Sequence, residues 1–154
     1  MTPRILTAAA SAAAEIAAAR LEAIAAAAGT PAYVYEAGHI RAAYAQLDAA
    51  FGGTPHAIHY AMKANSSLAI VRLVRTLGSA ADANSMGEVE VALRCGFAPS
   101  EIVFTGVGKR HEELERAVSL GLLAINVESP GELERLAALA ADRGAVARVA
   151  LRVN

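Results

Sequence analysis

The sequence contains little cysteine, no excess of charge of either sign and no long hydrophobic run. Cys95 is the single cysteine among 154 residues, so no disulfide can form within the chain, which fits a reducing cytoplasm. The formal net charge of −1 at pH 7 gives no electrostatic reason to expect a nucleic-acid partner. No apolar run reaches the length of a membrane-spanning helix. We therefore expect a cytoplasmic protein with no nucleic-acid partner and no membrane partner.

Three motifs built on glycine or leucine are also missing. No G-x-G-x-x-G follows a strand-like segment, which argues against a dinucleotide site. The segment "TGVGKR" (105–110) has glycine and lysine at the wrong spacing for a Walker A phosphate loop. No L-x-x-L-x-L pattern is present, so a leucine-rich repeat is excluded.

The sequence does contain enough apolar residues for one domain with a core. Hydrophobic residues make up 55% and charged residues 19%, which excludes a disordered chain. The first 28 residues are rich in alanine, but Glu15, Arg20 and Glu22 interrupt them, which makes a poor signal peptide. We predict an N-terminal helix over 1–28 that ends at Gly29, before Pro31.

Beyond Pro31, strand-like segments alternate with amphipathic helical segments. The predicted strands are 32–36, 57–63, 79–83, 101–106, 122–128 and 147–154. The predicted helices are 39–51, 67–78, 87–96, 111–121 and 130–144. This alternation is typical of βα units and a parallel sheet, with strand ends recurring about every 20–25 residues.

Polar residues at the strand ends favour a (β/α)8 TIM barrel over a doubly wound sheet. Five successive strands end in Lys63, Asp82, Thr105, Asn126 and Arg152. In a barrel these ends converge on one face, where active sites form, whereas an open sheet would spread them along its edge. Because a whole barrel needs about 250 residues, we expect the N-terminal portion of an α/β barrel, truncated before barrel closure.

Lys63 is the strongest candidate for a catalytic residue. Alternation along a strand places His59, Ala61 and Lys63 on one face, at the end of an apolar segment. Partial burial there would favour the neutral amine, the nucleophile that forms a Schiff base with a carbonyl. The alternative is a lysine whose amine simply reaches water from the strand end.

Motifs over about residues 29–154 resemble the fold-type III pyridoxal-phosphate decarboxylases, the alanine-racemase-like barrel enzymes. In order they are "GTPAYVYE", "YAMKANSS", "ADANSMGE", "IVFTGVGK", "INVESPGELERL" and "ALRVN". The segments "FTGVGK" and "NVES" are similar to the diaminopimelate decarboxylase branch in particular. The first 28 residues resemble no family.

The resemblance implies pyridoxal 5′-phosphate as the cofactor, an amino acid as the small-molecule substrate and no metal ion. Lys63 would form the covalent bond to the cofactor. Asp82 and Glu88 would belong to the polar shell around it, and Ser85, like Asn84, could bond its phosphate. Arg152 would lie at the barrel's centre beside that shell.

These polar residues also have structural explanations. Asp82 is placed to cap a helix, and Ser85 to bond neighbouring backbone. Glu88 lies in a helix's first turn, where the helix dipole favours acids. Arg152 fits a surface strand, and Lys109 in "GVGK" fits either the family motif or a solvated loop. The sequence alone leaves these alternatives open.

For the diaminopimelate branch, the implied activity is decarboxylation of meso-diaminopimelate to L-lysine in lysine biosynthesis. The resemblance also implies a C-terminal β-domain that supplies substrate contacts across a homodimer. We expect that β-domain and the second half of the barrel to be absent from the 154 residues. Residues 29–154 would then be the first part of the barrel, and the chain alone would be inactive.

Four alternatives remain open from the sequence. The chain could come from an ornithine- or arginine-type decarboxylase or from an alanine racemase. Alanine racemases usually follow the lysine with an Ala-Tyr-Gly-type segment, whereas here "ANSSLAI" follows Lys63. A non-catalytic pyridoxal-phosphate-binding protein would bind the cofactor without consuming an amino acid. A fragment without function would be molten or aggregated.

Overall fold

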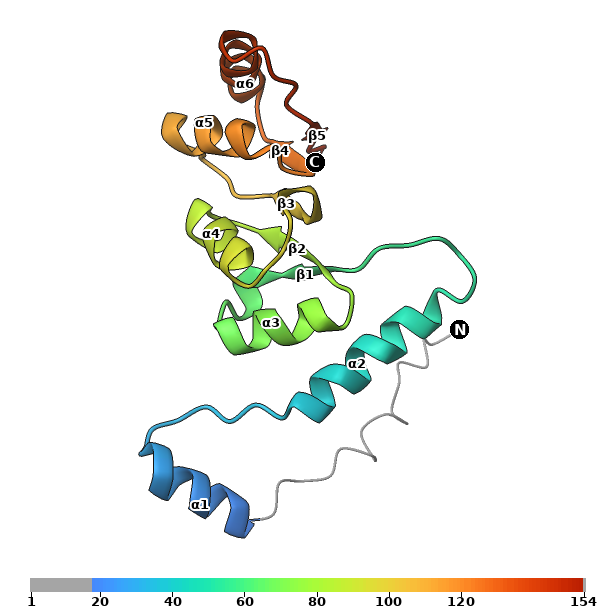
Figure 1. Ribbon diagram of the computed structural model, residues 1–154, viewed down its shortest axis with the longest axis vertical. Helices are drawn as coiled ribbons and strands as arrows, with labels where there is room; N and C mark the ends of the chain where they lie inside the picture. Colours follow the sequence, from blue (N-terminus) through green and yellow to red (C-terminus); the bar gives the residue numbers. More distant parts are fainter. Residues whose placement is uncertain (1–17, 154) are drawn as a thin grey trace.

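A computed structural model describes residues 18–153 and contains a five-stranded parallel sheet (Figure 1). Its strands are β1 (His59–Ala61), β2 (Ala80–Ala83), β3 (Ile102–Phe104), β4 (Ala124–Val127) and β5 (Val149–Leu151). Neighbouring strands pair in parallel, and their order in the sheet follows the chain. A doubly wound sheet reverses its order at a switch point, whereas barrel strands follow one another. The sheet is therefore the N-terminal portion of a (β/α)8 barrel, as predicted.

Helices connect the strands in the predicted βα alternation. The α-helices are α1 (Ala18–Ala28), α2 (Ala37–Ala50), α3 (Leu68–Thr76), α4 (Met86–Arg94), α5 (His111–Leu120) and α6 (Pro130–Asp142). Two 3-10 turns, η1 (Met62–Ala64) and η2 (Pro99–Glu101), precede α3 and β3. The predicted N-terminal helix is observed over 18–28, and its first part lies outside the described residues. Within residues 18–153, no helix is long and apolar enough to cross a membrane.

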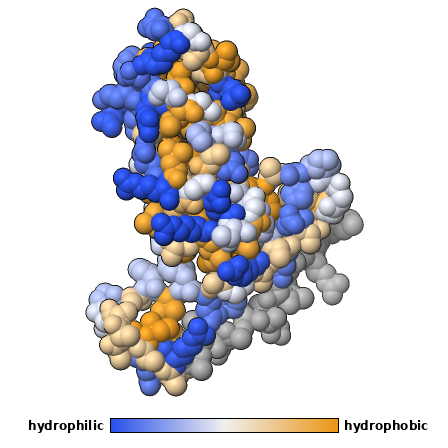
Figure 2. Space-filling model, viewed as in Figure 1, coloured by the Kyte–Doolittle hydropathy of each residue, from blue (hydrophilic) through white to orange (hydrophobic). Residues whose placement is uncertain are grey.

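The hydrophobic core lies between the strands and helices α3 to α6. In the three central strands alternate residues are buried: Ala81, Ala83, Ile102, Phe104, Ile125 and Val127. The residues between them, such as Asp82 and Asn126, are only half-buried and belong to the opposite face of the sheet. In the upper part of Figure 2, hydrophilic side chains gather on the left, over the helices α4 to α6 of Figure 1. The polar strand residues therefore lie on the face away from these helices.

The predicted strand over 32–36 is wrong. Residues 32–36 form no strand, and Tyr33 is 92% exposed. A strand satisfies its backbone N–H and C=O groups by pairing with a neighbour. Residues 32–36 pair with no strand in the described part of the chain, so their strand-like composition alone does not make them a strand.

The predicted strand over 57–63 is shorter in the structure and ends at Ala61. Met62 is completely buried and begins the turn η1, which contains Lys63. The Tyr60 hydroxyl donates to the carbonyl oxygen of Asn65 at 3.0 Å and fastens this turn to β1. Lys63 therefore lies just beyond the strand rather than at its last position.

Candidate functional site at the strand ends

Polar side chains gather at the carboxyl edge of the parallel sheet. Lys63 lies two residues beyond β1, and Asp82 and Asn126 are the penultimate residues of β2 and β4. Thr105 and Arg152 directly follow β3 and β5. Because all five strands are parallel and in chain order, these residues share one edge, as predicted from the sequence.

Lys63 is exposed, so the predicted partial burial of its side chain is wrong for residues 18–153. The strand ends before Lys63, and the turn η1 carries the side chain into solvent. Its amine has no hydrogen-bond or ion-pair partner within the described part of the chain. An amine without a partner at this edge is accessible to a carbonyl ligand.

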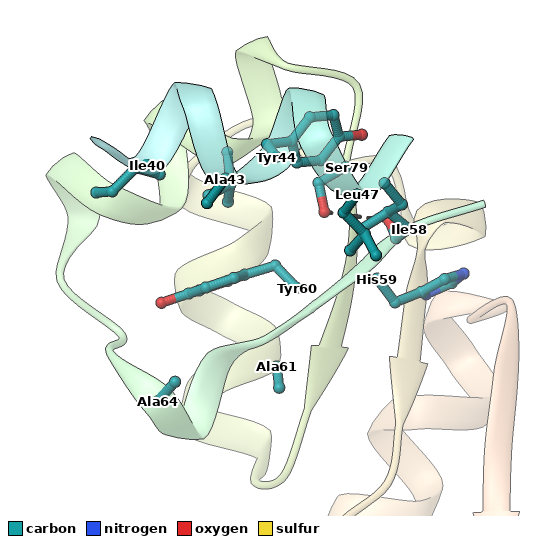
Figure 3. A pocket seen from close by; sticks show the side chains of 11 residues that line it. Ile40, Ala43, Tyr44, Leu47, Ile58, His59, Tyr60, Ala61, Ala64 and Ser79 are labelled. Carbon is teal, nitrogen blue, oxygen red and sulfur yellow. Dashed lines mark hydrogen bonds between the residues drawn. The ribbon is translucent and has the colours of Figure 1, made fainter. Parts of the chain in front are cut away.

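Figure 3 shows two side chains of β1, Tyr60 and His59, together with the cavity beside them. Tyr60 and His59 both line an apolar cavity of about 390 Å³ beneath α2, and their rings extend from β1 in different directions. Burial raises the pKa of the Tyr60 hydroxyl, which therefore remains a donor to Asn65. Asp82, Thr105 and Asn126 do not line this cavity.

Asp82 belongs to a ladder of three side chains from neighbouring strands, which we call the Asp82 ladder. The Thr105 hydroxyl donates to Oδ1 of Asp82, and Nδ2 of Asn126 donates to the Thr105 hydroxyl at 3.0 Å. Asp82 lies within β2, and Ser85 is the N-cap of α4. The alternative that Asp82 caps a helix is therefore wrong.

Ser85 and Glu88 both accept hydrogen bonds from backbone N–H groups at the start of α4. The Ser85 hydroxyl accepts from the Glu88 backbone N–H at 3.2 Å. Oε2 of Glu88 accepts from the Asn84 backbone N–H at 2.7 Å, one residue before the N-cap. A capping box would instead pair Glu88 with the N–H of the N-cap Ser85. This geometry matches the structural explanations for both residues and fixes their oxygens beside the end of β2.

Arg152 pairs with Glu128 across β4 and β5, with its guanidinium 3.2 Å from the carboxylate. About half of the Arg152 side chain is exposed. Within residues 18–153, no hydrogen bond or ion pair joins it to Asp82 or Glu88. The structure therefore places Arg152 at the surface, directly after β5, and the predicted position at a barrel centre beside those acids is not observed among residues 18–153.

Lys109 is buried, so the interpretation as a solvated loop residue is wrong. Only 1% of its side chain is exposed. Its amine donates to the Asn126 carbonyl oxygen at 2.6 Å and lies 3.3 Å from Oε1 of Glu132. It also lies 5.3 Å from the centre of the Phe104 ring, a cation–π distance. This pair joins the loop after β3 to the start of α6.

Sequence reasoning missed the Lys109–Glu132 pair, although two signals pointed to it. Of the 14 lysine and arginine residues only two are lysines, Lys63 and Lys109, and both follow strands. "SPGE" (129–132) also has the S-x-x-E spacing of a capping box, which fixes Glu132 at a helix start. The Ser129 hydroxyl accepts from the Glu132 backbone N–H at 3.3 Å.

The donors and acceptors at this edge fit pyridoxal phosphate. Lys63 offers an exposed amine for an aldehyde, and Oδ2 of Asp82 has no hydrogen-bond partner among residues 18–153. The buried Nδ2 of Asn84 has no acceptor in the described residues, so a donor at the end of β2 is unused. The same part of the chain contains no cluster of three or more His, Cys, Asp or Glu residues that could hold a metal ion. The exposed amine of Lys63 and the unused groups at the end of β2 suit an organic carbonyl ligand.

Comparisons with known proteins give diaminopimelate decarboxylases and another amino-acid decarboxylase. The chain is 45% identical to the diaminopimelate decarboxylase of Pseudomonas aeruginosa over 126 residues, which are 82% of this chain and 30% of the relative. A crystal structure of the Helicobacter pylori diaminopimelate decarboxylase complexed with L-lysine matches with a TM-score of 0.78 and 43% identity, over 81% of this chain and 32% of that one. The lysine/ornithine decarboxylase of Vibrio vulnificus, complexed with putrescine, matches at 25% identity and a TM-score of 0.71, over 86% of this chain and 35% of that one.

Residues 37–154 match the family described as "Pyridoxal-dependent decarboxylase, pyridoxal binding domain". The chain spans about a third of the length of the relatives it matches. The matched region begins at α2 and includes Lys63 and all five strands. The chain belongs to the pyridoxal-dependent decarboxylases and contributes strands of their pyridoxal-binding domain.

Proposed function

We propose that this chain is the N-terminal part of a pyridoxal-phosphate-dependent diaminopimelate decarboxylase. The complete enzyme would release carbon dioxide from meso-diaminopimelate and yield L-lysine, in lysine biosynthesis. The observation that carries this proposal is an exposed lysine, without a partner among residues 18–153, at the carboxyl ends of the strands of a barrel sheet that matches the pyridoxal-binding family. The substrate choice is supported by 45% identity to a diaminopimelate decarboxylase against 25% to a lysine/ornithine decarboxylase.

The described residues have distinct parts in this proposal. Pyridoxal phosphate, when bound, supplies the electron sink that decarboxylation of an amino acid needs. Lys63 would hold the cofactor's aldehyde carbon through its free amine. Asp82, Ser85 and Glu88 would give it a polar boundary at the end of β2, and Arg152 with Glu128 would extend that boundary along the same edge.

We further propose that the complete enzyme is a cytoplasmic homodimer. A reducing compartment is supported by the single cysteine, Cys95, which is buried and free. The chain's near-neutral charge supports small-molecule rather than nucleic-acid chemistry. Light scattering on the complete protein measures the oligomeric state, and a stable monomer would contradict the dimer.

Carbon dioxide release tests the proposed activity. The complete polypeptide that carries this segment is incubated with pyridoxal phosphate and, separately, with meso-diaminopimelate, ornithine, arginine and alanine. We expect carbon dioxide and L-lysine from meso-diaminopimelate, loss of both in Lys63→Ala, and no racemisation of alanine. Residues 1–154 assayed alone should show no turnover. Cofactor binding without consumption of any amino acid would instead indicate a non-catalytic binding protein.

A further inference from the structure

We propose that Thr105 and Asn126 are positioning residues that orient the carboxylate of Asp82 toward the cofactor site. The three residues come from neighbouring strand ends and form one hydrogen-bonded ladder. This inference rests on the proposed function, because it requires Asp82 to contact the cofactor or substrate at the pyridoxal site. Thr105 and Asn126 act through Asp82 and need not touch the cofactor themselves.

The hydrogen bonds of the Asp82 ladder all point in one direction. A side-chain amide nitrogen can only donate, so Asn126 gives its hydrogen to the Thr105 oxygen. The single hydroxyl hydrogen of Thr105 is then free for Oδ1 of Asp82. Oδ1 of Asp82 therefore accepts the hydrogen bond from Thr105. A hydrogen bond to a charged acceptor is stronger than one between neutral groups.

At the Asn126 end of the Asp82 ladder, buried groups hold the backbone by hydrogen bonds. The Lys109 amine donates to the Asn126 backbone oxygen at 2.6 Å, and the Glu132 carboxylate lies 3.3 Å from the same amine. Oε2 of Glu132 in turn accepts from the Glu128 backbone N–H at 2.8 Å. Because the backbone of Asn126 is held in this way, its side chain presents the amide to Thr105 from a fixed point.

The ladder leaves one oxygen of Asp82 available. Oδ1 accepts from Thr105, whereas Oδ2 has no partner among residues 18–153 and is not one of the buried unpaired atoms there. Ala61, which precedes the turn of Lys63, is the direct neighbour of Asp82 across β1 and β2. A fixed carboxylate with one free oxygen can accept from an N–H group of the cofactor or of the amino-acid substrate. We infer that the ladder holds this oxygen in the orientation needed for that contact.

A double-mutant cycle with Asp82 separates positioning from simple structural support. The complete decarboxylase is prepared as wild type, Thr105→Val, Thr105→Ser, Asp82→Asn and Thr105→Val/Asp82→Asn. The pyridoxal phosphate dissociation constant and the visible circular dichroism of the bound cofactor are measured for each. Thr76→Val is the matched control, since the Thr76 hydroxyl is exposed and donates only to the Leu73 carbonyl. Unfolding curves show whether each variant is folded.

We expect Thr105→Val to weaken cofactor binding roughly tenfold and to alter the visible dichroism, while Thr105→Ser and Thr76→Val remain close to wild type. In the Asp82→Asn background, Thr105→Val should add less than about twofold. An unchanged dichroism and affinity in folded Thr105→Val would overturn the inference. An effect equally large with and without Asp82 would also overturn it, because Thr105 would then act independently. Failure of the wild type to bind pyridoxal phosphate would instead contradict the proposed function.

Discussion

Helices α1 and α2 contain no buried residue, whereas each of α3 to α6 buries two or three side chains. Alanine, the best helix former, makes up 7 of the 11 residues of α1. Isolated helices shorter than about 12–15 residues are marginal in water, so packing decides whether they are stable. The region over 18–58 therefore depends on local propensity, while the region over 59–153 depends on its core. The candidate site lies entirely in the second region.

The largest expected difference between the two regions concerns ion pairs. Lys109→Met leaves Glu132 buried without its cation, so we expect a loss of about 3–5 kcal/mol in the free energy of unfolding. The matched variant in the N-terminal region is Arg20→Met, because Arg20 is 72% exposed and lies 4.0 Å from Glu36. That variant should unfold like the wild type. Urea unfolding followed by circular dichroism measures the free energy of unfolding of both variants. Equal losses in the two variants would contradict the expected difference between the two regions.

Two glycines extend the comparison to backbone packing. A Cβ on Gly106 would lie 2.1 Å from the Asn84 carbonyl oxygen, so Gly106→Ala must push β2 and β3 apart at the site. We expect it to destabilise the fold by about 1–3 kcal/mol. Gly38 lies in α2 with no atom near its would-be Cβ, so Gly38→Ala should be neutral or stabilising by at most about 1 kcal/mol. Thermal unfolding of the two variants decides this, and a harmless Gly106→Ala would show that the strand ends are loosely packed.

Helix capping predicts a smaller difference. The Ser85 hydroxyl accepts from the backbone of Glu88, whereas Ser67, the N-cap of α3, makes no such bond with its side chain. Ser85→Ala should therefore cost about 1 kcal/mol of stability, and Ser67→Ala much less. Chemical unfolding of both variants measures the difference. If the two substitutions caused equal losses of stability, the hydrogen bond of Ser85 at the start of α4 would contribute nothing to the stability of the fold.

The smallest expected effect is a pH dependence in the N-terminal region. Hydrogen bonds to the Thr54 carbonyl and to the Asp48 carboxylate raise the pKa of His56. A group whose pKa is raised on folding stabilises the fold fully below its unfolded pKa of about 6.5, and this contribution is lost as pH rises through the folded pKa. His56→Gln should remove this dependence. Melting temperatures of the wild type and of His56→Gln from about pH 5.5 to about pH 8.5 test this expectation. The same slope of melting temperature against pH in both proteins would exclude His56 as the cause.

Sequence patterns predicted the sheet region well because its residues find their partners within the chain. The strand-like segments over 79–83 and 122–128 placed Asp82 and Asn126 near strand ends, and parallel pairing brings those ends to the same end of the sheet. The prediction of a strand over 32–36 was wrong, because that segment pairs with no strand among residues 18–153. The burial of Lys109 depends on Glu132 and Phe104, which no local pattern connects to it. The hydrogen bonds of Thr105 likewise depend on three strands at once.

The most direct test of the central claim is the covalent trapping of pyridoxal phosphate by the chain of 154 residues. The adduct is reduced with borohydride, and peptides are mapped by mass spectrometry. The map is simple because Lys63 and Lys109 are the only lysines and Lys109 is buried. Arg72→Lys adds an exposed lysine on α3 as a matched control. We expect Lys63 to be labelled well in excess of that added amine and of the amino terminus, and the excess to disappear in Lys63→Ala. Equal labelling of the added lysine, or labelling mainly elsewhere, would contradict the assignment of Lys63 as the cofactor lysine.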